Sequence, residues 1–202
     1  DFGVCFDGDA DRCILVDDQG HVVRGDLVTA LLAPWFLKES PGSCIVYDLR
    51  SSRVVAEEIR KAGGQPRRER SGHAYLKKAL ADARAVFGGE FSGHYYFREN
   101  ACCDSALIAF AHVVNVVTRT GSTLAELVAP LKRYCGSGER SFHCENPRPI
   151  LERLADRFAD GRIDYLDGIT VQYDDWWFNV RPSITEPYLR LAVEADNPAL
   201  LA

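Results

Sequence analysis

Three aspartates alternate with small residues in the segment Asp7-Gly8-Asp9-Ala10-Asp11, and Arg12 follows them directly. The apolar run over residues 3–6 indicates a buried strand that ends in this loop. Carboxylates this close repel one another unless a cation lies among them. Oxygen ligands on a short loop suit a hard cation such as Mg²⁺, so Asp7, Asp9 and Asp11 are candidate ligands. A solvated acidic turn is the alternative, and Arg12 favours an anion that shares the metal.

A second polar loop, Gly88-Gly89-Glu90-Phe91-Ser92-Gly93-His94, follows a predicted strand over residues 85–87. Glycine permits tight turns and a close approach of the backbone. The side chains of Glu90, Ser92 and His94 offer an acceptor, a hydroxyl and a titratable ring, a set that suits sugar hydroxyls. A plain glycine-rich connection would not need three polar side chains.

A third loop, residues 181–187, lies between two predicted strands near the C-terminus and reads Arg-Pro-Ser-Ile-Thr-Glu-Pro. The Arg181 guanidinium, the hydroxyls of Ser183 and Thr185, and free backbone N–H groups could together hold a phosphate. Because proline-flanked loops are common, this segment alone is only suggestive.

Two further candidates, Arg50 and His73, follow predicted strands and begin predicted helices. Ligands of open α/β sheets gather at the carboxyl ends of strands, which favours a functional role, although a lone Arg or His is more often structural. His21, His112 and His143 lack such a context, and Trp176 and Trp177 are interpreted as packing residues.

Alternating strands and helices must position these loops. Strands are predicted over 3–6, 13–16, 44–47, 65–70 and 85–87, and helices over 26–38, 51–62, 74–81, 104–118 and 123–134. Asp26 and Asp104 are the expected helix starts, and Thr123 with Glu126 has the spacing of a capping box. The alternation predicts an α/β fold with a mixed or mainly parallel sheet and flanking helices.

The small residues Cys135-Gly136-Ser137-Gly138 indicate a linker to a second unit. That unit is expected to be a small α+β domain, with strands over 141–144, 169–173, 177–180 and 188–194 and a helix over 149–158. No internal repeat is visible in the chain.

The composition argues against two classes of partner, nucleic acids and membranes. The net charge of −5 offers no global field that would attract nucleic acid or an anionic membrane. No apolar run reaches the roughly 20 residues of a membrane span, and residues 1–12 do not resemble a signal peptide. Seven cysteines without paired metal spacing indicate reduced thiols, which predicts a cytoplasmic protein. The absence of Met suggests that the chain is a fragment.

In this order, the three loops resemble signatures of the α-D-phosphohexomutase family, and the resemblance covers essentially the whole chain. The Gly-Glu-Phe-Ser-Gly-His form and Trp-Trp-Phe-Asn before the last loop are most similar to the phosphomannomutase/phosphoglucomutase branch. The resemblance implies that residues 1–20 end domain II with the metal loop. Residues 21–137 would form domain III, which recognises the sugar, and residues 138–202 domain IV, which binds phosphate.

The resemblance also implies a reaction, in which a phosphoserine and a bisphosphate intermediate interconvert hexose 6-phosphate and hexose 1-phosphate, of mannose or glucose. Mg²⁺ on the aspartates would neutralise transferred charge, and Arg12 would orient the phosphoserine. His73 would move a proton, and Arg50 stands where relatives have a basic substrate contact. Ile184 departs from the usual Asn. The catalytic serine would lie in missing N-terminal domains of the same protein, so this chain alone is expected to be inactive.

Two other functions remain open on the sequence. A non-catalytic module that binds phosphosugars would use the same loops without turnover. A phosphoglucosamine mutase would share the reaction but prefer another sugar.

Overall fold

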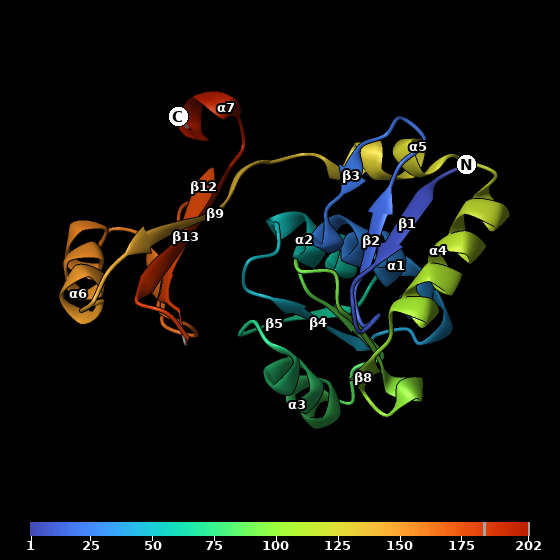
Figure 1. Ribbon diagram of the computed structural model, residues 1–202, viewed down its shortest axis with the longest axis horizontal. Coiled ribbons are helices and arrows are strands. Elements are labelled where there is room, and N and C mark those ends of the chain that lie inside the picture. The colour runs from blue at the N-terminus through green and yellow to red at the C-terminus, as the bar shows by residue number, and fades with distance from the viewer. Residues whose placement is uncertain (184, 202) are drawn as a thin grey trace. The chain divides into compact units, whose positions relative to one another are not determined.

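The computed structural model describes residues 1–183 and 185–201. The chain divides into two compact units (Figure 1): unit 1 is Asp1–Lys132 and unit 2 is Arg133–Ala202. Unit 1 contains two sheets and unit 2 contains one.

The larger sheet of unit 1 has the strand order β5-β4-β6-β7-β8. Its strands are β4 (Cys44–Asp48), β5 (Gln65–Glu69), β6 (Phe87–Gly89), β7 (Tyr95–Phe97) and β8 (Cys103–Asp104). Strands β5 and β6 pair with β4 in parallel, whereas β7 and β8 continue the sheet antiparallel. The expected α/β fold with a mixed sheet is confirmed, and the loops after β4, β5 and β6 leave the same edge of the sheet.

Unit 1 has helices that bury apolar side chains against this sheet, against other strands of the unit or against one another. They are α1 (Gly25–Glu39), α2 (Arg53–Lys61), α3 (His73–Ala83), α4 (Ala106–Thr120) and α5 (Leu124–Val128), with 3₁₀ turns at Arg98–Asn100 and Ala129–Leu131. In α2 the stripe is Val54, Val55 and Ile59, all fully buried. Between α1 and the sheet, the Phe36 and Phe87 rings stack with their centroids 4.5 Å apart.

A small antiparallel sheet joins β1 (Gly3–Phe6), β2 (Cys13–Val16) and β3 (Val22–Val23). The turn before β3 is held by Asp17, whose Oδ1 accepts hydrogen bonds from the backbone N–H groups of Gln19 and His21. The acidic loop connects β1 to β2, so two paired strands hold both of its ends.

Unit 2 is an antiparallel sheet of order β10-β11-β12-β13-β9. Its elements are β9 (Cys135–His143), α6 (Arg148–Arg157), β10 (Arg162–Asp164), β11 (Ile169–Gln172), β12 (Trp176–Pro182), β13 (Tyr188–Ala195) and α7 (Pro198–Leu201). The apolar core of unit 2 includes Ile169, Val171 and Phe178, and α6 packs Leu151 and Leu154 on it. Trp177 is buried and donates to Glu194, which confirms its packing role.

Several local predictions are wrong. Residues 135–138, which were expected to form a linker, begin strand β9. Their small side chains give no strand pattern, and backbone pairing with β13 makes them a strand. Asp104 lies in β8, and Ser105 caps α4 instead. Asp26 lies inside the first turn of α1 after Arg24 as the N-cap, since its carboxylate is used by other partners. The helix predicted over 123–134 ends at Val128, although its capping box is present.

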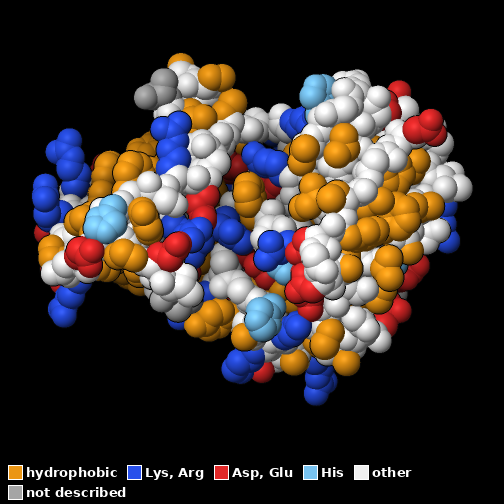
Figure 2. All heavy atoms as spheres, viewed as in Figure 1, with side chains coloured by type: hydrophobic (Ala, Val, Ile, Leu, Met, Phe, Trp, Pro, Cys, Tyr) orange, Lys and Arg blue, Asp and Glu red, His pale blue; other side chains and the backbone are white. Residues whose placement is uncertain are grey.

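Apolar side chains gather on the face of unit 1 that carries β1 and α4 (Figure 2). The exposed members include Leu107 and Val114 of α4, and Val22 of β3 is also exposed. Within residues 1–183 and 185–201, no helix is long and apolar enough to cross a membrane. All seven cysteines, which lie in this described part, are free thiols.

Candidate functional site

The acidic loop brings three carboxylates together. Asp7, Asp9 and Asp11 each offer an oxygen, and these oxygens lie within 4.8 Å of one another. The loop turns through a hydrogen bond from the Ala10 N–H to the Asp7 carbonyl, and Ala10 takes the left-handed conformation with φ 58°. A non-glycine residue there carries strain, which the flanking strands must hold. The convergence fits a small divalent cation with oxygen ligands.

Arg12 lies against this cluster and sets its electrostatics. Its backbone N–H donates to Asp7 Oδ1 at 3.1 Å, and its Nε lies 3.4 Å from Asp7 Oδ2. Desolvation acts to raise the pKa of Asp7, but the Arg12 N–H bond and the guanidinium charge outweigh it and leave the pKa below its ordinary value. The loop therefore keeps the Asp7 carboxylate ionised.

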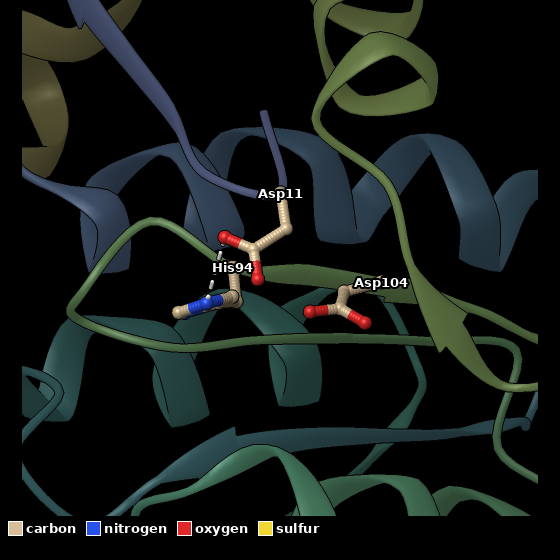
Figure 3. A group of neighbouring side chains, drawn as sticks. All are labelled: Asp11, His94 and Asp104. Atoms are coloured by element: carbon tan, nitrogen blue, oxygen red, sulfur yellow. Dashed lines mark ion pairs between the residues drawn. The ribbon is translucent and has the colours of Figure 1, made fainter. Parts of the chain in front are cut away.

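His94 joins the acidic loop to the sugar-type loop (Figure 3). The Asp11 carboxylate points at the His94 ring, with Asp11 Oδ1 3.3 Å from His94 Nε2 and Asp104 beside them. Asp11 Oδ1 is buried yet accepts no hydrogen bond of good geometry from the described residues. Arg12 Nε donates to His94 Nε2 at 3.4 Å.

The loop from Glu90 to His94 closes the tight hairpin between β6 and β7. Glu90 N–H donates to the His94 carbonyl at 2.9 Å, and Gly93 N–H donates to the Glu90 carbonyl at 3.0 Å. Ser92 Oγ lies 3.1 Å from His94 Nδ1 and donates to Glu90 Oε2 at 3.3 Å. The three side chains named from the sequence thus form one hydrogen-bonded row.

Glu90 is nearly buried and has several donors. Its Oε2 accepts from the Gly72 N–H at 3.3 Å, and its Oε1 accepts a short hydrogen bond from the Tyr96 hydroxyl. Burial of Tyr96, followed by the nearby Glu90 charge, raises the pKa of that hydroxyl, so Tyr96 stays a donor at neutral pH. Glu90 is therefore fixed in position with its charge largely satisfied.

Two loops meet by backbone contact. The Cys13 N–H donates to the Gly93 carbonyl at 3.0 Å, which ties the start of β2 to the hairpin loop. Gly93 has φ 92°, and a Cβ there would lie 2.7 Å from Ile14 Cδ1. A side chain at this position would separate the two loops, so glycine is required by conformation and by space.

Arg50 lies where the loop after β4 approaches Glu90. Its Nη2 lies 2.7 Å from Asp48 Oδ2 and 3.6 Å from Glu90 Oε2, and its guanidinium lies over the Phe91 ring. The Arg50 side chain is only 15% exposed. A guanidinium held by a carboxylate beside Glu90 can donate to a hydroxyl or an anion.

His73 is exposed at the first residue of α3. One turn later, Lys77 Nζ lies 2.8 Å from Asp104 Oδ1. The hydrogen bond that Lys77 donates to Asp104, opposed by desolvation, raises the pKa of Lys77. Residues four apart share a helix face, so His73 and Lys77 lie on one side of α3.

The third loop lies in unit 2. Arg181 Nη2 donates to Glu139 Oε2 at 2.8 Å, and Arg190 Nη1 donates to the other oxygen of Glu139 at 2.8 Å. Ser183 N–H donates to the Tyr188 carbonyl at 2.8 Å, and Thr185 is exposed. Ile184 lies outside the described residues.

Both units match known domains. Residues 24–134 match the family described as phosphoglucomutase/phosphomannomutase, alpha/beta/alpha domain III. Residues 142–202 match its C-terminal domain. The chain belongs to the phosphoglucomutase/phosphomannomutase family.

Relatives within this family include a phosphomannomutase of Methanocaldococcus jannaschii, which is 41% identical over 98% of this chain and 44% of its own length. A phosphomannomutase of Escherichia coli K12 is 38% identical over all of this chain and 45% of its own length. The chain thus spans a little under half the length of these relatives.

A solved structure agrees. The phosphoglucomutase/phosphomannomutase family protein of Burkholderia thailandensis superposes with a TM-score of 0.91 at 29% identity, covering all of this chain and 44% of that one. An N-acetylphosphoglucosamine mutase of Aspergillus fumigatus has a TM-score of 0.72 over 98% of this chain and 46% of that one. At 17% identity, the second likeness shows the shared fold alone.

The structure of this family member adds residues that the motifs did not indicate. Asp48, Tyr96 and Asp104 contact the residues named from the sequence in unit 1, and Glu139 does so in unit 2. Asp48 directly follows the strand predicted over residues 44–47 and lies two positions before Arg50, so a strand-end rule applied to carboxylates would have found it. Tyr96 and Glu139 lie within strands and carry no such signal.

Proposed function

We propose that the complete protein is a phosphohexomutase that interconverts hexose 6-phosphates and hexose 1-phosphates of mannose or glucose. The observation that carries this proposal is the junction of the metal-type and sugar-type loops, where Cys13 bonds to Gly93 and His94 lies beside Asp11. A charge-neutralising group and a hydroxyl-recognising group must share one site for phosphoryl transfer to a sugar. The most similar relatives cited are named phosphomannomutases.

The acidic loop fits Mg²⁺. The donor set consists of carboxylate oxygens, and the buried Asp11 Oδ1 accepts no well-formed hydrogen bond from the described residues. A buried oxygen without a donor is costly unless a cation or a water satisfies it. Asp7, Asp9 and Asp11 would hold the ion, which when bound supplies positive charge to the transferred phosphoryl group.

The other residues of unit 1 would bind and orient the substrate. Arg12 would direct a phosphorylated serine. Glu90, Ser92 and His94 would accept and donate hydrogen bonds to two hexose hydroxyls, and Arg50 would donate from the opposite loop. His73, exposed at the start of α3, would take the proton from the attacking hydroxyl.

Unit 2 would hold the phosphate that does not react. Arg181 offers a guanidinium, and Ser183 and Thr185 offer hydroxyls at the end of β12. A bisphosphate intermediate must turn over between two half-reactions, so the phosphate loop must accept either of its phosphates. The Glu139 carboxylate accepts a hydrogen bond from Arg181 and would orient the guanidinium before phosphate binds.

A substrate panel tests the proposal. The complete protein is assayed with Mg²⁺ on mannose, glucose and glucosamine 1-phosphates. We expect turnover of mannose or glucose 1-phosphate at rates well above that of glucosamine 1-phosphate. The opposite preference would assign a phosphoglucosamine mutase, and tight binding without turnover of any sugar would assign a binding module.

A further inference from the structure

One buried carboxylate, that of Asp48, connects three loops of unit 1. Asp48 is the last residue of β4 and is fully buried. Its Oδ2 accepts from Arg50 Nε at 2.8 Å and from Ser71 Oγ at 3.1 Å. Its Oδ1 accepts from Ser51 Oγ at 2.7 Å and from the Phe91 N–H at 3.2 Å.

These donors belong to separate segments that meet only in the folded protein. Arg50 follows β4, Ser71 follows β5, and Phe91 follows β6. Because the three strands run parallel, their carboxyl ends lie side by side, and one short side chain at the end of the central strand reaches all three loops. A buried carboxylate is stable only when charge and hydrogen bonds satisfy it. Asp48 therefore needs these donors, and the loops that supply the donors are in turn held by Asp48.

The same carboxylate decides where the Arg50 charge lies. Arg50 Nη2 is 2.7 Å from Asp48 Oδ2 but 3.6 Å from Glu90 Oε2. Removing the Asp48 charge would leave Glu90 as a competing partner for the guanidinium. Glu90 and Arg50 would then neutralise each other instead of facing a ligand.

We propose that Asp48 is a positioning residue of the hexose site, which holds Arg50, Ser71 and the start of the Glu90–His94 loop in register. The proposal rests on the proposed function of that site. Asp48 acts through Arg50 and the loop backbone, and it does not itself contact the sugar.

The chain contains a matched control in Asp26 and Arg24. Asp26 is also fully buried, and its oxygens accept from Arg24 Nε at 3.1 Å and Nη2 at 2.8 Å, two residues away as in the Asp48 pair. It further accepts from the backbone N–H groups of Leu27 and Ser52. Leu27 and Ser52 lie at the starts of α1 and α2, so the hydrogen bonds of Asp26 order helix ends and not the loops after β5 and β6. The Arg24 guanidinium, like that of Arg50, nevertheless also lies over the Phe91 ring.

The experiment compares Asp48→Asn and Asp26→Asn in the full 202-residue chain. Unfolding in urea measures stability, calorimetry measures binding of mannose 1-phosphate and of inorganic phosphate, and NMR follows the Arg50 Nε–H signal. We expect both variants to lose stability. Only Asp48→Asn should shift the Arg50 signal and weaken mannose 1-phosphate binding, by about tenfold, with inorganic phosphate unchanged.

A double-mutant cycle separates positioning from general damage. In an Arg50→Ala background, Asp48→Asn should have little further effect on sugar affinity, because the group that it positions is gone. Additive losses, or equal losses of sugar affinity in the Asp48 and Asp26 variants, would overturn the proposal. If Asp48→Asn does not fold, Ser71→Ala replaces it in the same cycle, with the same two outcomes.

Failure of the proposed function has a different signature. A wild-type chain that binds no hexose phosphate would count against the hexose site itself. The Arg50 Nε–H signal needs no sugar, so it still decides whether Asp48 positions this guanidinium: an unchanged signal in Asp48→Asn rejects that role.

Discussion

At the scale of residues, carboxylates serve different purposes according to burial. Asp9 is exposed on the acidic loop, where an ionised oxygen is available to a cation. Asp48 is buried and satisfied by donors from several elements. Identical chemistry therefore binds ligands in one place and orders loops in another, and the difference is set by what surrounds it.

The acidic loop predicts metal affinity. Asp9→Asn should reduce Mg²⁺ binding by about tenfold or more, because one charged ligand of three is lost and a charge-assisted contact is worth roughly 1.5–3 kcal/mol. Calorimetry, or line broadening by Mn²⁺, measures this. The control is Asp174→Asn, which changes an exposed aspartate of unit 2 and should leave Mg²⁺ binding as in the wild type. Equal Mn²⁺ broadening in the two variants would contradict the assignment.

We expect the Arg181 guanidinium to contribute to phosphate affinity. Arg181→Ala should weaken hexose-phosphate binding by roughly 1.5–3 kcal/mol, since a charge-assisted hydrogen bond is removed. The control is Arg162→Ala, an arginine that is 74% exposed and paired with Asp174. Titration with mannose 1-phosphate measures both, and indistinguishable affinities would remove Arg181 from the phosphate site.

At the scale of elements, close approaches of the backbone decide where site residues lie. Gly168 lies before β11 with φ 64°, and a Cβ there would lie 2.1 Å from the Val180 carbonyl oxygen and 2.6 Å from Arg181 Cα. The strand that carries Arg181 is thus in contact with a glycine that no motif indicates.

Substitutions at two glycines with similar φ angles distinguish the cost of backbone strain from the cost of a steric collision. Gly138 has φ 67°, but a Cβ there meets nothing within 4 Å. Gly138→Ala should cost about 1–2 kcal/mol, the penalty of a left-handed non-glycine residue. Gly168→Ala adds a backbone collision and should cost roughly 3–5 kcal/mol while weakening hexose-phosphate binding. Urea unfolding measures both, and similar costs would show that β12 moves aside freely.

We expect His112 to make the folding stability depend on pH. Its ring stacks on Phe97 with centroids 5.6 Å apart, and desolvation lowers its pKa. The neutral ring is favoured in the fold, so its contribution is present above the unfolded pKa of about 6.5 and is lost as the pH falls through that value toward the folded pKa.

His112→Phe removes this titration and keeps an aromatic ring at the position. We expect the variant to gain stability relative to the wild type between pH 7 and pH 5, as measured by urea unfolding. At pH 8 both rings are neutral, so the difference there reports packing alone. A difference that stays constant over the whole range would contradict the inference.

At the scale of the whole molecule, the chain has loops proposed to bind substrate in both units and spans a little under half the length of its relatives. Phosphoryl transfer through a covalent intermediate needs a nucleophile, and electrostatic groups cannot replace it. The serines at hand have other roles: Ser52 caps α2, Ser105 caps α4, and Ser71 donates to Asp48.

We therefore expect the isolated chain to show no conversion of mannose 1-phosphate to mannose 6-phosphate, even with Mg²⁺ and a bisphosphate activator. Asp9→Ala provides the background rate. Turnover clearly above that background would place the reactive serine inside this sequence. Turnover restored by adding a separate fragment of a full-length relative that carries a reactive serine would support the division of roles.

The order of most elements and the family could be predicted from the sequence alone, and the three polar loops proposed to carry chemistry could be located in it. These features depend on local patterns: apolar periodicity, strand ends followed by polar residues, and motifs within six or seven positions. Strands β7 and β8 escaped prediction because they are only three and two residues long. A run this short shows no period, and pairing with neighbours decides it.

Only the tertiary structure decided which residues hold the loops. Asp48 meets Phe91 across 43 positions and Ser71 across 23, and Glu139 meets Arg181 across 42. A buried polar group must find its partners wherever the fold brings them, and no local pattern records that choice. The residues proposed to perform the chemistry could thus be named from the sequence, whereas the residues that hold them in place could be identified only once the strands were side by side.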